Sequence, residues 1–257
     1  MPPVKTPLYT DPYLVASVDA AFSVLAHIAR EPDQSLQEIS GRCQLSVSQT
    51  NRLLHTLRLH GYILKTPLKR YRLGYSALNL GHHANQQFPL IEYAAADLDQ
   101  VWRETQESVH LVQRSGLEVI ILDLRESLQN VRVVSEIGKR GPLHLGGSGK
   151  VYLAYDDPKL LEQILALNES APDPSGHSTL AREIRQIREQ GYYVARGDFE
   201  AEAFSIAAPI LGTQHRIVGS LAISGPLARL TPEHEVKLIA SCLAAVNRIG
   251  QQIQGKL

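Results

Sequence analysis

Residues 35–57 read SLQEISGRCQLSVSQTNRLLHTL, and this stretch decides the fold of the first third of the chain. Residues 35–38 have the S-x-x-E spacing of a capping box, in which serine and glutamate side chains satisfy backbone amides at the start of a helix. Residues 46–49 repeat the arrangement in its S-x-x-Q form. Two capped helices joined by a short turn at residues 43–45 predict a helix-turn-helix motif.

The second helix of this motif has two sides with different chemistry. The side expected to be buried, at 100° per residue, consists of Thr50, Leu53, Leu54 and Leu57. The other side carries short polar groups near the N-terminal end and then an arginine, as a recognition helix requires, because in the major groove Gln and Asn can read adenine and Arg can read guanine. The side chains predicted to contact DNA are Ser46, Ser48, Gln49, Asn51, Arg52 and His55.

A basic hairpin is expected directly after this helix. Residues 62–65 and 71–73 are short apolar segments that flank a basic turn at residues 66–70. A β-hairpin that follows a helix-turn-helix is typical of a wing. We predict that Lys65, Lys69 and Arg70 contact phosphates or the minor groove, which contributes affinity and orientation but little sequence information.

The distribution of charge supports a polyanion-binding segment. The chain has 26 basic and 26 acidic residues, yet no acidic residue occurs in the 53 positions between Glu38 and Glu92. Those positions carry seven Lys and Arg residues. One concentrated basic segment in a neutral chain favours a nucleic-acid-binding module joined to a second part. A solvated basic face without a partner is the simpler alternative.

A further helix is expected before the motif, beginning near Ser17. Val18, Phe22, Leu25 and Ala29 recur at helical spacing as its apolar stripe. The helix should end at residues 31–32, because a residue that precedes proline is pushed out of helical geometry.

Neither an export signal nor a membrane span is expected from the residues. Residues 1–12 are rich in proline and polar residues, lack the apolar core of a signal peptide, and are expected to be disordered. No segment approaches the roughly 18 uncharged apolar residues that span a bilayer. Cys43 and Cys242 lie far apart and form no C-x-x-C pair. A reducing, cytoplasmic location without membrane contact is therefore expected.

The rest of the chain alternates helices and strands. Strands are expected at residues 109–113, 117–124, 131–137, 205–211 and 217–224. A linker helix is expected at residues 75–89, closed by Pro89 and interrupted at residues 81–83. Further helices are expected at residues 90–106, 146–155 and 236–253. One more should begin at Pro158, and another should run from Ser178 or Thr179 to Gly191. Antiparallel hairpins with segregated helices indicate an α+β domain. The adjacent His82 and His83 are not expected to share a metal ion, because neighbours on a helix point about 100° apart.

The glycine-rich segment at residues 146–150 opens one of these helices. It is not a Walker A loop, because Val151 stands where Ser or Thr would bind magnesium. Free backbone amides at a helix N-terminus attract anions, so a small carboxylate could bind here. A tight turn without a ligand explains the glycines equally well from the residues alone.

Eight short segments, in addition to the two capped helices, are spread along residues 13–250. They are residues 17–19, 51–57, 61–62, 71–74, 137–144, 147–150, 206–210 and 223–226. In order and spacing they resemble the isocitrate-lyase-regulator (IclR) family of bacterial transcription factors. The resemblance implies a winged helix-turn-helix at residues 13–74, a linker helix at 75–89 and a GAF- or profilin-like effector-binding domain at 90–257. It also implies homodimers or homotetramers on palindromic operators in double-stranded DNA.

The resemblance implies an effector site in the second domain. Its expected residues are Val133, Gly147, Ser148, Ser205, Ala222 and Ser224. Ala195 stands where some members carry an acid, and Ala222 stands where some carry Ser. Fewer polar groups favour a larger or less polar organic acid, such as an aromatic acid, over glyoxylate or pyruvate.

Two other functions are weighed against this interpretation. A ligand-independent architectural DNA binder would show no compound-dependent change in operator affinity. A small-molecule hydrolase with an accessory DNA-binding domain would need an activated serine, but no G-x-S-x-G elbow is present. We therefore expect neither catalysis nor a cofactor, and we leave open whether the protein represses or activates transcription.

Overall fold

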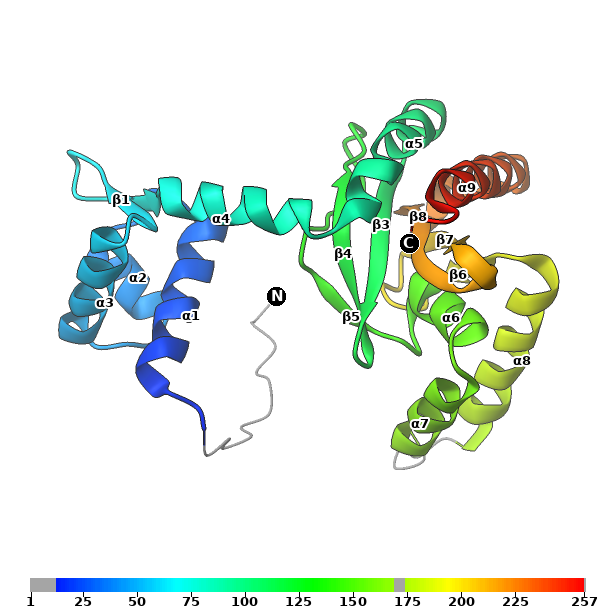
Figure 1. Cartoon of the computed structure of the whole chain (residues 1–257), viewed down its shortest axis with the longest axis horizontal. Helices are drawn as coiled ribbons and strands as arrows, with labels where there is room; N and C mark the ends of the chain where they lie inside the picture. The colour runs from blue at the N-terminus through cyan, green and yellow to red at the C-terminus, as the bar shows by residue number, and fades with distance from the viewer. Residues whose placement is uncertain (1–12, 169–173, 257) are drawn as a thin grey trace. The chain divides into compact units, whose positions relative to one another are not determined.

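The computed structural model describes residues 13–168 and 174–256, and the chain divides into two compact units, Met1–Gln87 and Phe88–Leu257. The predicted disorder of residues 1–12 lies outside the described residues. Elements of the first unit are α1 (Ala16–Arg30), α2 (Leu36–Arg42), α3 (Val47–Leu59), β1 (Ile63–Lys65), β2 (Tyr71–Leu73) and α4 (Tyr75–Gln86) (Figure 1). The helix-turn-helix and the hairpin are confirmed.

The capping residues explain where α2 and α3 begin. The Ser35 backbone amide donates to Glu38 Oε2 at 2.7 Å, and the Glu38 amide donates to Ser35 Oγ at 3.4 Å, so both halves of the capping box form. At α3 the Gln49 amide donates to Ser46 Oγ at 3.2 Å. These bonds replace the intrahelical partners that the first amides of a helix lack.

The core of the first unit shows that the face of α1 predicted to be buried is wrong. Its buried side chains are Val24, Ile28, Ile39, Leu54, Ile63 and Tyr71. In α1 the buried positions follow the i, i+4 row of Ala20, Val24 and Ile28, whereas Val18 and Phe22 are 48% and 67% exposed. The helix has two apolar faces, and periodicity alone does not identify the one that packs against α3.

The linker helix also differs from its prediction. α4 continues through Gly81 and both histidines, since one glycine weakens a helix without breaking it. It ends at Gln86, and Pro89 occupies the first turn of α5 (Pro89–Thr105) instead of closing α4. This is the position where proline is favoured, because its missing amide would be unpaired there anyway.

The second unit is built on a six-stranded antiparallel sheet with the order β5-β4-β3-β8-β7-β6. Its strands are β3 (Ser108–Ser115), β4 (Glu118–Arg125), β5 (Arg140–Pro142), β6 (Tyr193–Arg196), β7 (Ala203–Leu211) and β8 (Ile217–Pro226). Its helices after α5 are α6 (Gly146–Tyr155), α7 (Pro158–Asn168), α8 (Pro174–Gln190) and α9 (Pro232–Ile253). Helices α5 and α9 cover one face of the sheet, and α6 to α8 lie on the other (Figure 1). The α+β class is confirmed.

Successive side chains of the central strands point to opposite faces of the sheet and so belong to two separate hydrophobic cores. On β7, Ile206 and Ala208 pack under α5 and α9, while Ala207 packs with α6. On β8, Ile223 belongs to the first core and Ala222 to the second. Because successive residues of a strand face opposite sides, the residues near Ala222 and Ala207 mark the side of the sheet that α6 covers.

Two expectations for this unit are wrong, and two of its strands were missed. Residues 131–137 form no strand, although inward and outward side chains alternate there, because no neighbouring strand pairs with them in the described part of the chain. α8 begins at Pro174, earlier than Ser178, with proline again in a first turn. The short strands β5 and β6, at the two sheet edges, were not predicted.

Candidate DNA-binding surface and effector pocket

The outward side of α3 has the expected composition. Thr50 and Leu54 are buried, and Leu53 and Leu57 are half-buried against the rest of the unit. The side chains predicted to read bases are all exposed, namely Ser48, Gln49, Asn51, Arg52 and His55. Ser46 is exposed too, but its hydroxyl oxygen is occupied by capping. The polar face is therefore available to a groove of DNA.

The turn before α3 is held by one buried serine. Ser40 Oγ donates to the carbonyl oxygen of Leu45 at 2.7 Å, and the Leu45 amide donates to the carbonyl oxygen of Ser40. Gln44 adopts the left-handed conformation that the tight turn requires, with φ of 55°. These contacts fix the angle at which α3 leaves α2.

The wing carries its basic residues at the tip and on both strands. Lys69 adopts φ of 58° in the turn, and Lys65 lies over the Tyr71 ring at 5.5 Å from its centroid. Arg70 is partly occupied, because it donates to the Asp33 carbonyl oxygen at 2.5 Å and lies 3.5 Å from Glu38 Oε2. Arg70 therefore braces the wing against α2, and Lys69 is the better candidate for a phosphate contact.

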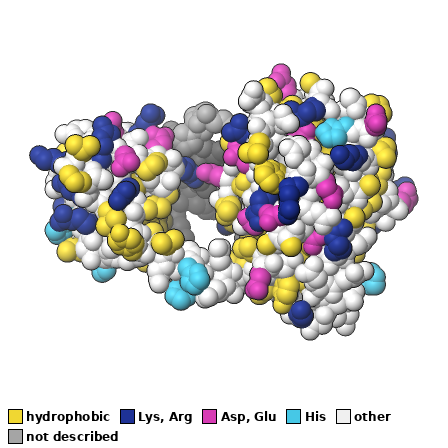
Figure 2. Space-filling view, turned by 90° about the horizontal axis from the view of Figure 1, so that it is seen from above, with side chains coloured by type: hydrophobic (Ala, Val, Ile, Leu, Met, Phe, Trp, Pro, Cys, Tyr) yellow, Lys and Arg dark blue, Asp and Glu magenta, His cyan; other side chains and the backbone are white. Residues whose placement is uncertain are grey.

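Positive charge gathers on the surface of this unit. All seven Lys and Arg residues of the acid-free segment are exposed. In Figure 2 this unit, on the left, shows dark-blue Lys and Arg side chains on its surface, with apolar side chains between them. Such a surface attracts phosphates and releases the counterions that surround duplex DNA.

A cavity of about 150 Å³ lies on the α6 side of the sheet in the second unit. Val133, Gly147, Ser148, Ser205, Ala222 and Ser224, the six residues expected from the family resemblance, all line it. They come from the strands β7 and β8, from the first turn of α6 and from the segment before β5. Residues far apart in the sequence thus meet around one space.

The first turn of α6 offers hydrogen-bond donors to this cavity. Among the described residues, Ser148 Oγ is buried and has no hydrogen-bond partner. The Gly146 amide is already used, because it donates to Asp198 Oδ2 at 3.1 Å. A buried hydroxyl without a partner is costly, so a polar ligand group beside Ser148 would be favoured. The N-terminal end of the helix favours a negative charge in the same place.

Most of the other lining residues were not predicted as site residues, and three of them matter for the chemistry of a ligand. They are His110 on β3, Lys139 before β5 and Phe199 after β6. Burial, aided by the positive charge of Lys139, lowers the pKa of His110 to about 4. The imidazole is therefore neutral at pH 7 and can donate or accept a hydrogen bond. Lys139 lies 3.5 Å from Glu200 and over the Phe199 ring, and it brings an ammonium group to the wall of the cavity.

Behind the cavity a buried lysine joins α6 to its neighbours. Lys150 is 5% exposed, and its Nζ lies 2.6 Å from Asp198 and 2.9 Å from Glu183. It also donates to the Tyr193 hydroxyl at 3.2 Å. Burial alone would lower the pKa of Lys150, but the bonds to Asp198 and Glu183 outweigh it and raise that pKa above its usual value. The lysine is thus a charged structural residue.

Neither a metal centre nor a membrane span is found in the described parts of the chain. Within residues 13–168 and 174–256, no three His, Cys, Asp or Glu side chains are grouped as metal ligands would be. The rings of His82 and His83 are 5.6 Å apart and tilted. No helix in those ranges has both the length and the apolar character needed to cross a bilayer.

A winged helix-turn-helix joined to a domain with a ligand-sized cavity defines a ligand-responsive DNA-binding regulator. The chain belongs to the IclR family of bacterial transcriptional regulators, since residues 82–252 match the IclR C-terminal domain and residues 17–67 match the IclR helix-turn-helix domain. It therefore combines DNA binding with a C-terminal effector-binding domain.

Individual relatives agree with this assignment. The chain is 29% identical to the HTH-type transcriptional regulator KdgR of Escherichia coli over 94% of both chains. The crystal structure of Thermotoga maritima IclR is 27% identical and superposes with a TM-score of 0.79 over 93% of this chain and 98% of that one. An IclR homologue from Microbacterium hydrocarbonoxydans, complexed with 4-hydroxybenzoate, shares the fold at 22% identity and a TM-score of 0.75, over 92% and 98% of the two chains.

Proposed function

We propose that this regulator binds palindromic operators as a homodimer or homotetramer, and that a small organic acid with one aromatic ring modulates this binding. The observation that carries the proposal is the cavity, which combines a volume of about 150 Å³ with apolar walls and a few polar groups. An apolar protein cavity of about that size accommodates benzene. Glyoxylate and pyruvate would leave most of such a space unfilled.

The lining residues suit the two ends of an aromatic acid. The first turn of α6, with the unpaired hydroxyl of Ser148, and the ammonium of Lys139 are the groups that favour a carboxylate. Val119, Ile121 and Phe199 line the same cavity and suit a ring. Neutral His110 can exchange a hydrogen bond with a ring substituent. The 4-hydroxybenzoate complex of the Microbacterium homologue supports this chemical class.

On DNA, we assign α3 to the major groove and the wing to the flanking backbone. Two copies related by two-fold symmetry would place their recognition helices on half-sites about 34–36 Å apart, one turn of the duplex. Arg52 is assigned to a base and Lys69 to a phosphate, and the protein acts in the cytoplasm, where the chromosome lies. The oligomer has two arrangements of its DNA-binding domains, one that binds the operator well and one that binds it weakly. The effector can change operator affinity by no more than the difference between its own affinities for these two arrangements.

Thermal stability in the presence of candidate acids tests the effector class. Benzoate and 4-hydroxybenzoate are expected to raise the Tm of the full-length protein, and pyruvate and glyoxylate are expected to leave it unchanged. Ligand at one hundred times its Kd stabilises the folded state by about 2.7 kcal/mol. Stabilisation by pyruvate or glyoxylate alone would contradict the aromatic-acid proposal.

A variant that fills the cavity gives the matched control for this screen. Val133→Phe adds bulk at a half-buried, cavity-lining position and should abolish the benzoate shift, whereas Ala96→Leu on the exposed face of α5 should keep it. Gly147 is a poor choice, because a Cβ there would lie 2.9 Å from Ala207 Cβ and 3.1 Å from Ser205 Oγ. A larger residue at Gly147 would push α6 away from β7 and disturb the fold as well as the ligand.

A further inference from the structure

Residues 126–139, here called the strap, form one wall of the cavity through Val133, Ser135 and Lys139. Both ends of the strap are tied to the domain. At its first end, Trp102 Nε1 donates to the Glu126 carbonyl oxygen at 2.8 Å, and Ser127 Oγ donates to the Gln106 carbonyl oxygen at 2.6 Å. At its other end, backbone hydrogen bonds join the strap to Ile121 on β4.

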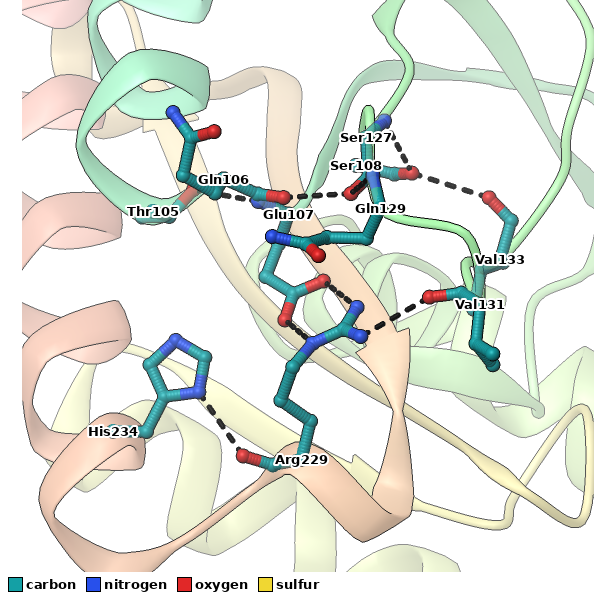
Figure 3. A network of polar contacts seen from close by, with 10 residues as sticks. All are labelled: Thr105, Gln106, Glu107, Ser108, Ser127, Gln129, Val131, Val133, Arg229 and His234. Carbon is teal, nitrogen blue, oxygen red and sulfur yellow. Dashed lines mark hydrogen bonds and ion pairs between the residues drawn. The ribbon is translucent and has the colours of Figure 1, made fainter.

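Two side chains hold the middle of the strap, as Figure 3 shows. Arg229 Nη1 donates to the Val131 carbonyl oxygen at 3.1 Å, and Ser108 Oγ donates to the Val133 carbonyl oxygen, also at 3.1 Å. Within the described chain, no strand pairs with these residues. Side chains therefore supply the hydrogen bonds that a neighbouring strand would otherwise provide.

Arg229 is itself held in place by a buried carboxylate. Its Nε lies 2.5 Å from Glu107 Oε1 and its Nη2 lies 2.6 Å from Oε2, so the pair is bidentate. The Glu107 side chain is 1% exposed and that of Arg229 is 31% exposed. Hydrogen bonds to Glu107 raise the pKa of Arg229. A Cβ at Gly225 would lie 2.5 Å from Glu107 Oε2, so glycine at this position makes room for the carboxylate.

The backbone of Arg229 is held in place as well. His234 Nδ1 lies 3.2 Å from the Arg229 carbonyl oxygen (Figure 3), at the start of α9. Ser108 also accepts a hydrogen bond from the Ser127 amide at 3.1 Å, so it joins the root of the strap to its middle. The strap is thus connected to β3 through Ser108, to the end of α5 through Ser127, and to the turn before α9 through Arg229.

We propose that Glu107, Arg229 and Ser108 are positioning residues for the effector, which hold the strap closed so that Val133, Ser135 and Lys139 form a wall of the cavity. This proposal rests on the effector site proposed above. None of the three side chains lines the cavity; Glu107 acts by aligning Arg229, and Arg229 acts by fixing the Val131 carbonyl. When the pair is broken, the wall can move outward and the ligand is held less tightly.

Hydrogen–deuterium exchange on the full-length protein without ligand tests the holding role. In Arg229→Gln, the amides of Ser127 and Gln129, which donate within the strap network, should exchange about tenfold faster or more, because hydrogen bonds to charged groups contribute that much to a local equilibrium. Arg229→Lys keeps the positive charge but loses the planar guanidinium that binds both oxygens of Glu107. Amide exchange in this variant should therefore lie between the rates of the original protein and of Arg229→Gln. Unchanged exchange in Arg229→Gln would overturn the proposal.

The matched control is Arg248→Gln. Arg248 pairs with Asp97, another carboxylate that is 5% exposed, and lies outside the strap network. This variant should lose comparable stability while strap exchange stays within about twofold of the original, since a local opening reports local bonds. Equal acceleration of the strap in Arg248→Gln would show only general destabilisation and would contradict a specific holding role.

Calorimetric titration with benzoate separates this proposal from the function on which it rests. Arg229→Gln should bind benzoate about tenfold more weakly, Arg229→Lys should recover part of the loss, and Arg248→Gln should bind like the original protein. Equal benzoate affinity in Arg229→Gln would refute the positioning role. Failure of the original protein to bind benzoate would instead refute the aromatic-acid effector, while the exchange experiment still decides whether the pair holds the strap.

Discussion

Replacement of Lys150 by methionine is expected to destabilise the effector-binding domain by about 3–5 kcal/mol, the usual cost of removing one partner from a buried ion pair. The methionine fills a similar volume, but Asp198 and Glu183 then face each other without the cation that lies between them. Urea unfolding, followed by the fluorescence of Trp102, measures the free energy of unfolding of this domain.

Two further variants show whether charge is the cause. Lys159→Met removes an exposed lysine of α7 and should change stability by less than about 0.5 kcal/mol. Combining Lys150→Met with Asp198→Asn and Glu183→Gln should recover much of the loss, because no carboxylate is then buried unpaired. A loss below about 1 kcal/mol in Lys150→Met would mean that the lysine is not the charge that holds α6 to α8.

Replacement of Arg52 by alanine is expected to weaken binding to a selected operator by about 1–3 kcal/mol for each half-site. A dimer that uses both copies would lose about twice that amount, while binding to random duplex would change far less. Lys69→Ala should instead weaken binding to all duplexes by a similar factor, and should lower the salt slope by about 1 for each phosphate that is no longer neutralised. Fluorescence anisotropy at several salt concentrations measures both effects.

The contrast between these two variants is the informative result. Arg52 lies on the exposed side of α3, and Lys69 lies in the turn of the wing. Equal losses on selected and random DNA for Arg52→Ala would refute its assignment to a base. Arg30→Ala, in α1, serves as a charge-matched control outside the acid-free segment.

Local signals were sufficient for the DNA-binding unit. A capping box acts within four residues, and a helical face is visible within one window, so α2, α3 and the hairpin could be predicted before any tertiary contact was known. The face of α1 could not, because Val18, Phe22 and the buried Val24 are all apolar. The choice between two apolar faces depends on which other helix packs there.

Prediction of the residues that line the cavity required information that a single sequence carries poorly. Its six expected residues came from the family resemblance, and the structure brings them together. His110, Lys139 and Phe199 come from three separate strands and connections, and nothing in their local sequence relates them. The strap shows the same limit: its alternating side chains predict a strand, but side chains of Arg229 and Ser108, distant in sequence, take the place of a partner strand.

The most direct test of a ligand-controlled DNA-binding protein is the affinity of the full-length chain for a duplex selected from a random library, measured by fluorescence anisotropy with and without saturating benzoate. We predict specific binding that weakens steeply with salt, and a change in Kd of about 5–150-fold on addition of benzoate, the usual size of an allosteric coupling. Failure to retain any duplex at low salt would contradict the account. The same Kd with and without benzoate, when benzoate raises the Tm, would contradict it as well.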